Sequence, residues 1–534
     1  MNKGYFGVML DMSRNGVMKV EKVKEFAKIL ASFGYNMIQL YTEDTYEVDN
    51  EPYFGYMRGR YSKAELKEIV SYCESIGIEV IPCVQTLAHL NQIFTWPIYH
   101  QILDCADIML VGEERTYVLL ENIFKTLREC FTSKYINIGM DEAMTLGLGK
   151  YLQKNGYHDR FEILLKHLKI VCELAEKYGF KPTMWSDMFI RIANNNEYYP
   201  ANPNPIPDEV KALVPENVGL IYWDYYHTNY EHYDKMLNIH EEFKRDVWFA
   251  GGAWCWGTFS PRNGFTFATM KPAMKACLDH SVNNVLITMW GDNGKECSFF
   301  SLLPSLYAVR KYYEGVTDEK VIKEGFEKLT GENYDKFFDL DLPNLVAEDY
   351  GGRNCLGKYG LYNDPFNGYL DSTVAEGIGK KYKKVACRLR KHAKSGDYAH
   401  IFDCIAKLCD VLTYKVELGS LTRKYYQAND KEALKALLHS YKMSERKLEA
   451  FYKSFKNCWF IDNKPCGFDV QDIRLGGLKQ RLKSCRERLE DYLAGKIDSI
   501  PELEEKLLDY CGVGDMGKAI NVPRWGETVT PNKL

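Results

Sequence analysis

The 534-residue sequence lacks any run of 18 uncharged apolar residues, the length that a membrane-spanning helix needs. Its first apolar stretch begins at Tyr5 and is interrupted by Asp11, too soon for a signal peptide. A net charge of −4 and an isoelectric point near 6.3 leave no excess of positive charge for nucleic acid or an anionic membrane. These absences predict a cytoplasmic protein with neither a membrane nor a nucleic-acid partner.

Paired cysteine motifs are also absent. The 16 cysteines are scattered without CxxC spacing, and many fall within helical patterns. They are typical of reduced, buried thiols in a cytosolic protein, so we expect neither a disulfide framework nor a zinc site. No GxGxxG or GxxxxGK[ST] motif follows any expected strand, which removes the usual signature of a nucleotide-binding fold.

What the first 335 residues do contain is a repeating alternation of apolar strands and amphipathic helices. The strands show little polar alternation, which indicates a parallel sheet covered on both faces. Eight strand–helix units predict a closed (β/α)8 barrel, a TIM barrel in an α/β domain over residues 1–335, and an open doubly wound sheet is the alternative. The expected strands cover residues 5–11, 36–41, 78–84, 135–138, 182–185, 218–223, 247–251 and 284–290.

From residue 336 the pattern changes to long amphipathic helices, which predict a mainly α-helical C-terminal domain over residues 336–534. Residues 459–478 form a turn-rich, aromatic segment between two of these helices. We interpret this segment as a structural clasp onto the barrel. The alternatives are a contribution to the rim of a cleft or a contact in a homodimer.

The chain is organised around residues 135–146, where a short strand delivers two adjacent carboxylates, Asp141 and Glu142. Burying an unpaired charge is costly, so the pair is best placed where the strand ends over a solvated cleft. Two carboxylates in a cleft can perform general-acid chemistry. The alternative is that they only begin the loop or cap the next helix.

Barrel enzymes carry their chemistry at the carboxyl ends of the strands. Tryptophans, carboxylates and one arginine gather at these ends in the sequence, and the opposite ends carry nothing comparable. Aromatic rings stack on sugar faces and charged groups bind sugar hydroxyls, so the set predicts a carbohydrate pocket. Besides the two acids, the candidates are Arg14, His89, Trp185, Tyr222, Asp224, Trp254, Trp290 and Asp292.

These residues resemble glycoside hydrolase family 20, the β-N-acetylhexosaminidases. The segment Asn137-Ile-Gly-Met-Asp-Glu142 resembles the family motif His-x-Gly-Gly-Asp-Glu, with Asn137 in place of His and Met140 in place of the second Gly. The likeness extends over about residues 5–312. The small α/β domain that often precedes the barrel is missing and a helical domain follows, which indicates a distinct subgroup.

The resemblance implies a retaining mechanism without an enzyme nucleophile, in which the substrate's 2-acetamido oxygen forms an oxazolinium intermediate. Glu142 is then the general acid, Asp141 orients the acetamide and Tyr222 donates to its oxygen. The resemblance also implies that His89 tunes the acids and that Arg14, Asp224 and Asp292 bind the sugar hydroxyls, with Trp185, Trp254 and Trp290 as walls.

We therefore expect an exo-acting β-N-acetylhexosaminidase for terminal GlcNAc or GalNAc of short oligosaccharides, with no cofactor and no metal. One alternative is a barrel glycosidase with a carboxylate nucleophile, for which Asp187, Asp224 or Asp292 could serve. Another is a non-catalytic carbohydrate-binding protein, against which the intact Asp141–Glu142 pair argues.

Overall fold

The computed structural model describes residues 4–347 and 355–510. Eight parallel strands close into a barrel in the order β1-β10-β9-β8-β7-β6-β3-β2, which confirms the predicted fold. A two-stranded hairpin, β4 (Leu103–Cys105) and β5 (Ile108–Met109), is inserted between β3 and β6. The barrel strands are β1 (Phe6–Asp11), β2 (Met37–Thr42), β3 (Glu79–Val84), β6 (Tyr135–Asn137), β7 (Lys181–Trp185), β8 (Gly219–Trp223), β9 (Val247–Gly252) and β10 (Asn284–Met289).

The barrel closes where its first and last strands pair, with Phe6 opposite Val285 and Leu10 opposite Met289. Every residue of β1 is buried, as expected for a strand covered by the barrel interior on one face and by helices on the other. Gly7 is required here because a Cβ would lie 2.4 Å from the carbonyl oxygen of Met37 on β2.

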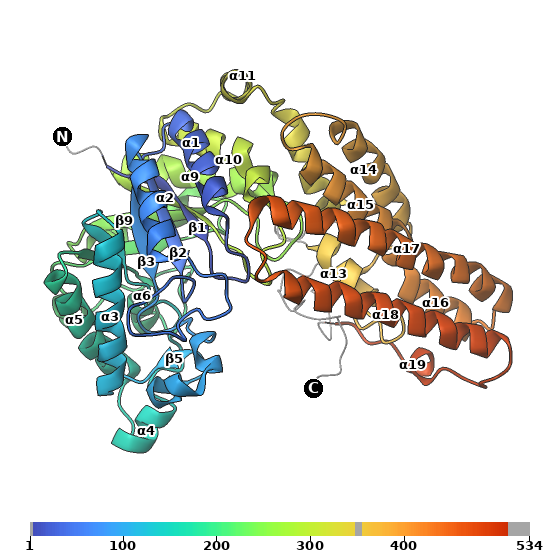
Figure 1. Cartoon of the computed structure of the whole chain (residues 1–534), viewed down its shortest axis with the longest axis horizontal. Helices are drawn as coiled ribbons and strands as arrows, with labels where there is room; N and C mark the ends of the chain where they lie inside the picture. Colours follow the sequence, from blue (N-terminus) through green and yellow to red (C-terminus); the bar gives the residue numbers. More distant parts are fainter. Residues whose placement is uncertain (1–3, 348–354, 511–534) are drawn as a thin grey trace.

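Helices between the strands form the outer layer (Figure 1). A capping box formed by Ser62 and Glu65 begins α2. Shorter helices lie in the longer loops. The helices of this part are α1 (Val20–Phe33), α2 (Lys63–Ser75), α3 (Glu114–Cys130), α4 (Lys150–Asn155), α5 (Arg160–Lys177), α6 (Asp187–Ala193), α7 (Asp208–Leu213), α8 (Tyr230–Glu241), α9 (Asn263–Asp279) and α10 (Leu303–Tyr313), with 3₁₀ turns η1 (Ile93–Thr95), η2 (Pro97–Ile102) and η3 (Phe299–Leu302).

The rest of the described chain is helical and lies to one side of the barrel (Figure 1). No helix in the described ranges is long and apolar enough to cross a membrane. This helical region comprises α11 (Glu319–Thr330), η4 (Asp335–Asp341), α12 (Leu342–Leu345), α13 (Leu356–Tyr362), η6 (Asp371–Thr373), α14 (Ile378–His392), α15 (Ala399–Lys415), α16 (Leu418–Gln427), α17 (Lys431–Asp462), α18 (Phe468–Leu493) and α19 (Pro501–Glu504).

The prediction of a turn-rich segment over residues 459–478 is wrong, because the turn is much shorter. Helix α17 continues to Asp462 and α18 starts at Phe468, so only residues 463–467 form a turn. Figure 1 shows this turn at the barrel end of the α17–α18 pair. The Lys464 backbone N–H donates to the carbonyl oxygen of Val17 (2.8 Å), and the Asn15 side-chain amide donates to the carbonyl oxygen of Gly467 (2.8 Å). These contacts support the interpretation as a clasp onto the barrel.

Candidate active site

A cleft with a cavity of about 110 Å³ lies at the carboxyl ends of the strands, where a barrel enzyme carries its chemistry. Most of the residues that we predicted from the sequence meet there, although they come from loops after several different strands. The lining residues are Arg14, His89, Asp141, Glu142, Trp185, Trp223, Tyr225, Tyr226, Trp256, Trp290 and Asp292.

The loop after β6 presents the two acids through an unusual backbone. Gly139, Met140 and Glu142 all have positive φ, at 72°, 71° and 52°. A Cβ at Gly139 would lie 2.1 Å from Gln85 Oε1, so only glycine fits there. Asn137 Oδ1 accepts from the Gly139 N–H (3.0 Å), and Gln85 Oε1 accepts from the Met140 N–H (3.2 Å). Strain of this kind persists only where neighbouring groups fix it, and it is common at functional sites.

Asp141 is held as an anion. Its Oδ1 accepts from Gln85 Nε2 (2.8 Å), and its Oδ2 lies 3.3 Å from His89 Nε2. Burial acts to raise the pKa of Asp141, but the charge and hydrogen bond of His89 outweigh it and lower that pKa. Burial acts to lower the pKa of His89, and Asp141 in turn raises it to about 9.

Glu142 has the opposite character. The Glu142 side chain is half exposed, and its partial burial together with the neighbouring charge of Asp141 raises the pKa of its carboxyl. The Glu142 backbone N–H donates to Asp187 Oδ2 (3.2 Å), which also forms an ion pair with Arg191 Nε (3.2 Å). Burial, followed by the charge of Asp141, raises the pKa of Asp187 to about 7. Adjacent carboxyls with pKa values shifted in opposite directions can serve as a proton donor and a fixed anion.

Arg14 is oriented by acids from three directions. Its guanidinium lies 3.2 Å from Asp11 Oδ2, 3.5 Å from Glu43 Oε1 and 3.4 Å from Asp292 Oδ1. It also sits over the Trp290 ring, 4.6 Å from the centroid. Glu43 was missed, although a charged residue directly after the second buried strand was a usable signal.

Tyr222 and Asp224 do not reach the cleft, which corrects two predicted site residues. Both are completely buried on the outer face of the strand, where the Tyr222 ring stacks on His240 of α8 at 4.9 Å. The Tyr222 hydroxyl donates to Asp224 Oδ2 (2.9 Å). Since successive residues of an extended chain face opposite sides, Trp223 and Tyr225 point into the cleft instead.

Trp254 is a third correction, because Trp256 lines the cleft in its place. The Trp254 ring is stacked behind Trp256, with centroids 4.1 Å apart and an angle of 23° between the planes. Its Nε1 donates to the carbonyl oxygen of Tyr225 (2.8 Å). Trp254 therefore supports two cleft residues without lining the cleft.

Among the described residues, one group of three side chains is close enough together to hold a metal ion: Asp224, His227 and His232. The two imidazole rings are stacked, with centroids 3.5 Å apart and planes 10° from parallel. An imidazole lone pair lies in the ring plane, so one ion cannot lie on the lone pairs of both rings. A hydrogen bond and an ion pair explain the cluster better. His227 Nδ1 is hydrogen-bonded to Asp224 Oδ2 (2.8 Å), and His232 Nε2 lies 3.2 Å from the same oxygen. Burial raises the pKa of Asp224, and these histidines outweigh that effect and lower it to about 2.

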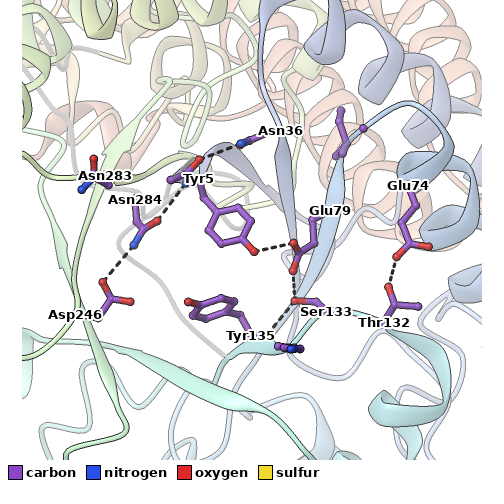
Figure 2. A pocket seen from close by; sticks show the side chains of 14 residues that line it. Tyr5, Asn36, Glu74, Glu79, Thr132, Ser133, Tyr135, Asp246, Asn283 and Asn284 are labelled. Carbon is purple, nitrogen blue, oxygen red and sulfur yellow. Dashed lines mark hydrogen bonds between the residues drawn. The ribbon is translucent and has the colours of Figure 1, made fainter. Parts of the chain in front are cut away.

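A larger depression of about 950 Å³ lies at the opposite, amino ends of the strands. Figure 2 shows that its acids are already engaged as acceptors. The Tyr5 hydroxyl (2.7 Å) and the Ser133 hydroxyl (2.6 Å) donate to Glu79, and Asn284 Nδ2 donates to Asp246 (3.2 Å). The arrangement is that of a structural network, which is the usual role of this end of a barrel.

Two family models match the chain. The model described as "Glycosyl hydrolase family 20, catalytic domain" matches residues 4–232, and the "Glycoside Hydrolase 20C C-terminal domain" matches residues 335–522.

Among curated proteins, Hexosaminidase D of Bos taurus is 24% identical over 283 residues, which cover 50% of this chain and 74% of that protein. Hexosaminidase D of Homo sapiens is 24% identical over 224 residues, covering 39% and 42%. A solved structure of a GH20 exo-β-N-acetylglucosaminidase from Vibrio harveyi, in complex with N-acetylglucosamine, aligns with a TM-score of 0.47 at 14% identity, covering 64% and 59%. The matches thus span less than two thirds of the human and the Vibrio harveyi chains.

Proposed function

Because the chain belongs to glycoside hydrolase family 20, we propose that it is an exo-acting β-N-acetylhexosaminidase that removes terminal β-linked GlcNAc or GalNAc by substrate-assisted, retaining hydrolysis. One observation carries the proposal. Asp141 and Glu142 enter one cleft side by side with pKa values shifted in opposite directions.

In the first step the substrate's acetamido oxygen forms a bond to the anomeric carbon while the glycosidic bond breaks. Glu142 gives its proton to the leaving oxygen, and its raised pKa keeps that proton available near neutral pH. Asp141, kept ionised by His89, accepts from the acetamide N–H and stabilises the positive charge that develops there. In the second step Glu142 takes a proton from the water that opens the oxazolinium ring.

The corrected lining changes one role. Tyr225 lines the cleft and Tyr222 does not, so we assign to Tyr225 the hydrogen bond to the acetamide oxygen. Arg14 and Asp292, 3.4 Å apart, are placed to bind hydroxyls of the terminal sugar. The rings of Trp185, Trp256 and Trp290 line the same cleft and would form the walls of the sugar pocket.

The conventional mechanism has one remaining candidate nucleophile. Asp224 lies behind the strand, and the buried Asp187 is engaged by the Glu142 N–H and Arg191. Asp292 does line the cleft, where it pairs with Arg14. A mechanism with an enzyme nucleophile therefore depends on Asp292.

We also propose that the chain has two domains, a catalytic barrel up to about residue 335 and a separate helical domain after it. The cytoplasmic location and the homodimer contact stay predictions.

The test is release of p-nitrophenol from the β-N-acetylglucosaminide, the β-N-acetylgalactosaminide and the β-glucoside. We expect activity on the acetamido sugars alone and a fall in kcat of about 10²- to 10³-fold in Glu142→Gln. A thiazoline analogue of the oxazolinium should inhibit tightly. Comparable activity on the glucoside, abolished in Asp292→Asn, would instead establish an enzyme nucleophile. No activity on any of the three substrates would favour a sugar-binding protein.

A further inference from the structure

We propose that the helical region positions Asp292 in the cleft, through Arg474 and Gln471 of α18 and Lys358 of α13, which hold the loop of residues 291–296 that follows β10. This inference rests on the proposed function for its kinetic consequence. Its structural basis is independent of that function.

The backbone of this loop is strained. Asn293, Gly294 and Lys295 have consecutive positive φ values of 62°, 126° and 53°. For residues other than glycine this conformation is strained and persists only where the surroundings fix it. Within the loop, the carbonyl oxygen of Gly291 accepts from the N–H groups of Gly294 (3.3 Å) and Lys295 (2.9 Å).

The barrel holds the start of the loop, where the Gly291 N–H donates to Asp11 Oδ2 (2.8 Å) and the Gly257 N–H donates to the carbonyl oxygen of Asp292 (3.2 Å). The helical region adds three donors to the carbonyl oxygens that follow. The carbonyl oxygen of Asn293 accepts from Lys358 Nζ (3.1 Å) and from Arg474 Nη1. The carbonyl oxygen of Gly294 accepts from Gln471 Nε2 (3.0 Å). A Cβ at Gly294 would lie 2.5 Å from Arg474 Nη1, so α18 presses directly against the loop.

A buried charge cluster anchors these contacts. Glu296 Oε1 lies 2.8 Å from Lys358 Nζ and 3.0 Å from Arg474 Nη1. The side chains of Lys358 and Glu296 are 0% and 1% exposed, and that of Arg474 is 10% exposed. Ion pairs that are this deeply buried constrain the loop more than a surface pair does. The cluster has two cations and one carboxylate, so removing Arg474 still leaves Glu296 paired with Lys358.

Asp292 is the one residue of this loop that faces both Arg14 and the cleft. The general-acid pair comes from the loop after β6, elsewhere on the rim. Displacing the loop of residues 291–296 should therefore weaken recognition of the sugar hydroxyls while the proton transfer from Glu142 continues. Arg474, Gln471 and Lys358 are positioning residues in this sense.

The experiment compares Arg474→Met with Arg486→Met, a control in the same helix. Arg486 pairs with Glu445 and Glu490, away from the loop. We expect Arg474→Met to raise KM about tenfold with kcat within about threefold of wild type, and to speed hydrogen exchange of a peptide covering residues 288–297 about tenfold. The control should change neither quantity.

A double-mutant cycle with Asp292→Asn tests whether Arg474 acts through that carboxylate. In the Asp292→Asn background, Arg474→Met should add less than twofold to KM. Full additivity, or an equal effect of Arg486→Met, would overturn the proposal. If Arg474→Met does not fold, Gln471→Leu serves, because it removes one neutral hydrogen bond and an unpartnered amide oxygen. We expect it to raise KM about threefold and to speed the same exchange.

The exchange measurement separates the two proposals. If the wild type cleaves no acetamido sugar but Arg474→Met still speeds exchange of residues 288–297, the proposed function fails and the positioning role stands. Unchanged exchange in Arg474→Met and in Gln471→Leu would overturn the positioning role whatever the activity.

Discussion

Replacing His89 with Asn tests the charge balance around the two cleft carboxylates. His89 Nε2 lies 3.3 Å from Asp141 and 3.7 Å from Glu142, and Nδ1 lies 3.8 Å from Asp107. Asn is the matched replacement because His89 has a φ of 57°, a conformation that Asn tolerates better than most residues. The variant removes the cation and keeps the backbone conformation.

The expected size of the effect follows from the pKa of His89. A rise from 6.5 to about 9 corresponds to about 3 kcal/mol of preference for the protonated form in the folded state. A raised pKa contributes stability that is fully present below pH 6.5 and is lost as the pH rises through about 9. Relative to His89→Asn, the wild type should therefore lose about 3 kcal/mol of unfolding free energy across this window.

Urea unfolding followed by tryptophan fluorescence at pH 6, 7.5 and 9.5 measures this difference. The pH–rate profile gives a second readout, because without His89 the pKa of Asp141 should rise and the acid limb of kcat/KM should move upward by at least about 1 pH unit. Parallel stability curves for the two proteins, together with an unmoved acid limb, would refute the pairing of a charged His89 with Asp141.

Three further tests use five substitutions in and around the site. Tyr225→Phe should lower kcat/KM at least tenfold by removing a hydrogen bond to the acetamide, whereas Tyr222→Phe should cost about 1 kcal/mol of stability and leave KM unchanged; equal kinetics of the two variants would contradict the assignment. Trp256→Ala should raise KM about tenfold and Trp254→Ala should mainly lower the melting temperature, and a larger KM effect at Trp254 would reverse the pair. Asp187 has a raised pKa, so wild-type stability should fall by about 1 kcal/mol or more from pH 4 to 7 relative to Asp187→Asn, as denaturant unfolding would show; curves that stay parallel would argue against a protonated Asp187.

The barrel and the acid pair were predictable because each follows from a strong local signal. The strands are apolar on both faces. The short strand β6 ends at Asn137, so Asp141 and Glu142 fall in the loop that follows it. Glu43 carries the same signal after β2, and only its distance of 3.5 Å from Arg14 reveals its role.

The register after β8 was not predictable from the same kind of pattern. Residues from Gly219 to Trp223 are all buried, and both faces of the strand are apolar or aromatic. Nothing in such a run indicates which alternate set faces the cleft, and a shift of one residue exchanges Tyr222 for Trp223. A polar alternation would have fixed the choice.

The end of α17 shows tertiary packing overriding local preference. Trp459, Phe460 and Ile461 resemble a strand or a turn in isolation, yet they continue the helix. The Trp459 ring contacts Phe468 at the start of α18, with centroids 5.7 Å apart and an edge-to-face angle of 61°. This contact between two helices is invisible to a pattern that is read along one segment.

The clasp also sets an order of assembly during synthesis. Glu296 and Arg474, which form an ion pair, are 178 residues apart in the chain. At about 5 to 20 residues per second, a ribosome needs roughly 9 to 36 seconds to add that length. All eight strands are therefore synthesised well before α18. Until then the loop after β10 lacks its contacts with that helix. If α18 has the positioning role that we propose, a chain truncated before this helix would keep the acid pair of the barrel but would lack the contacts of Arg474 and Gln471 with the loop of residues 291–296.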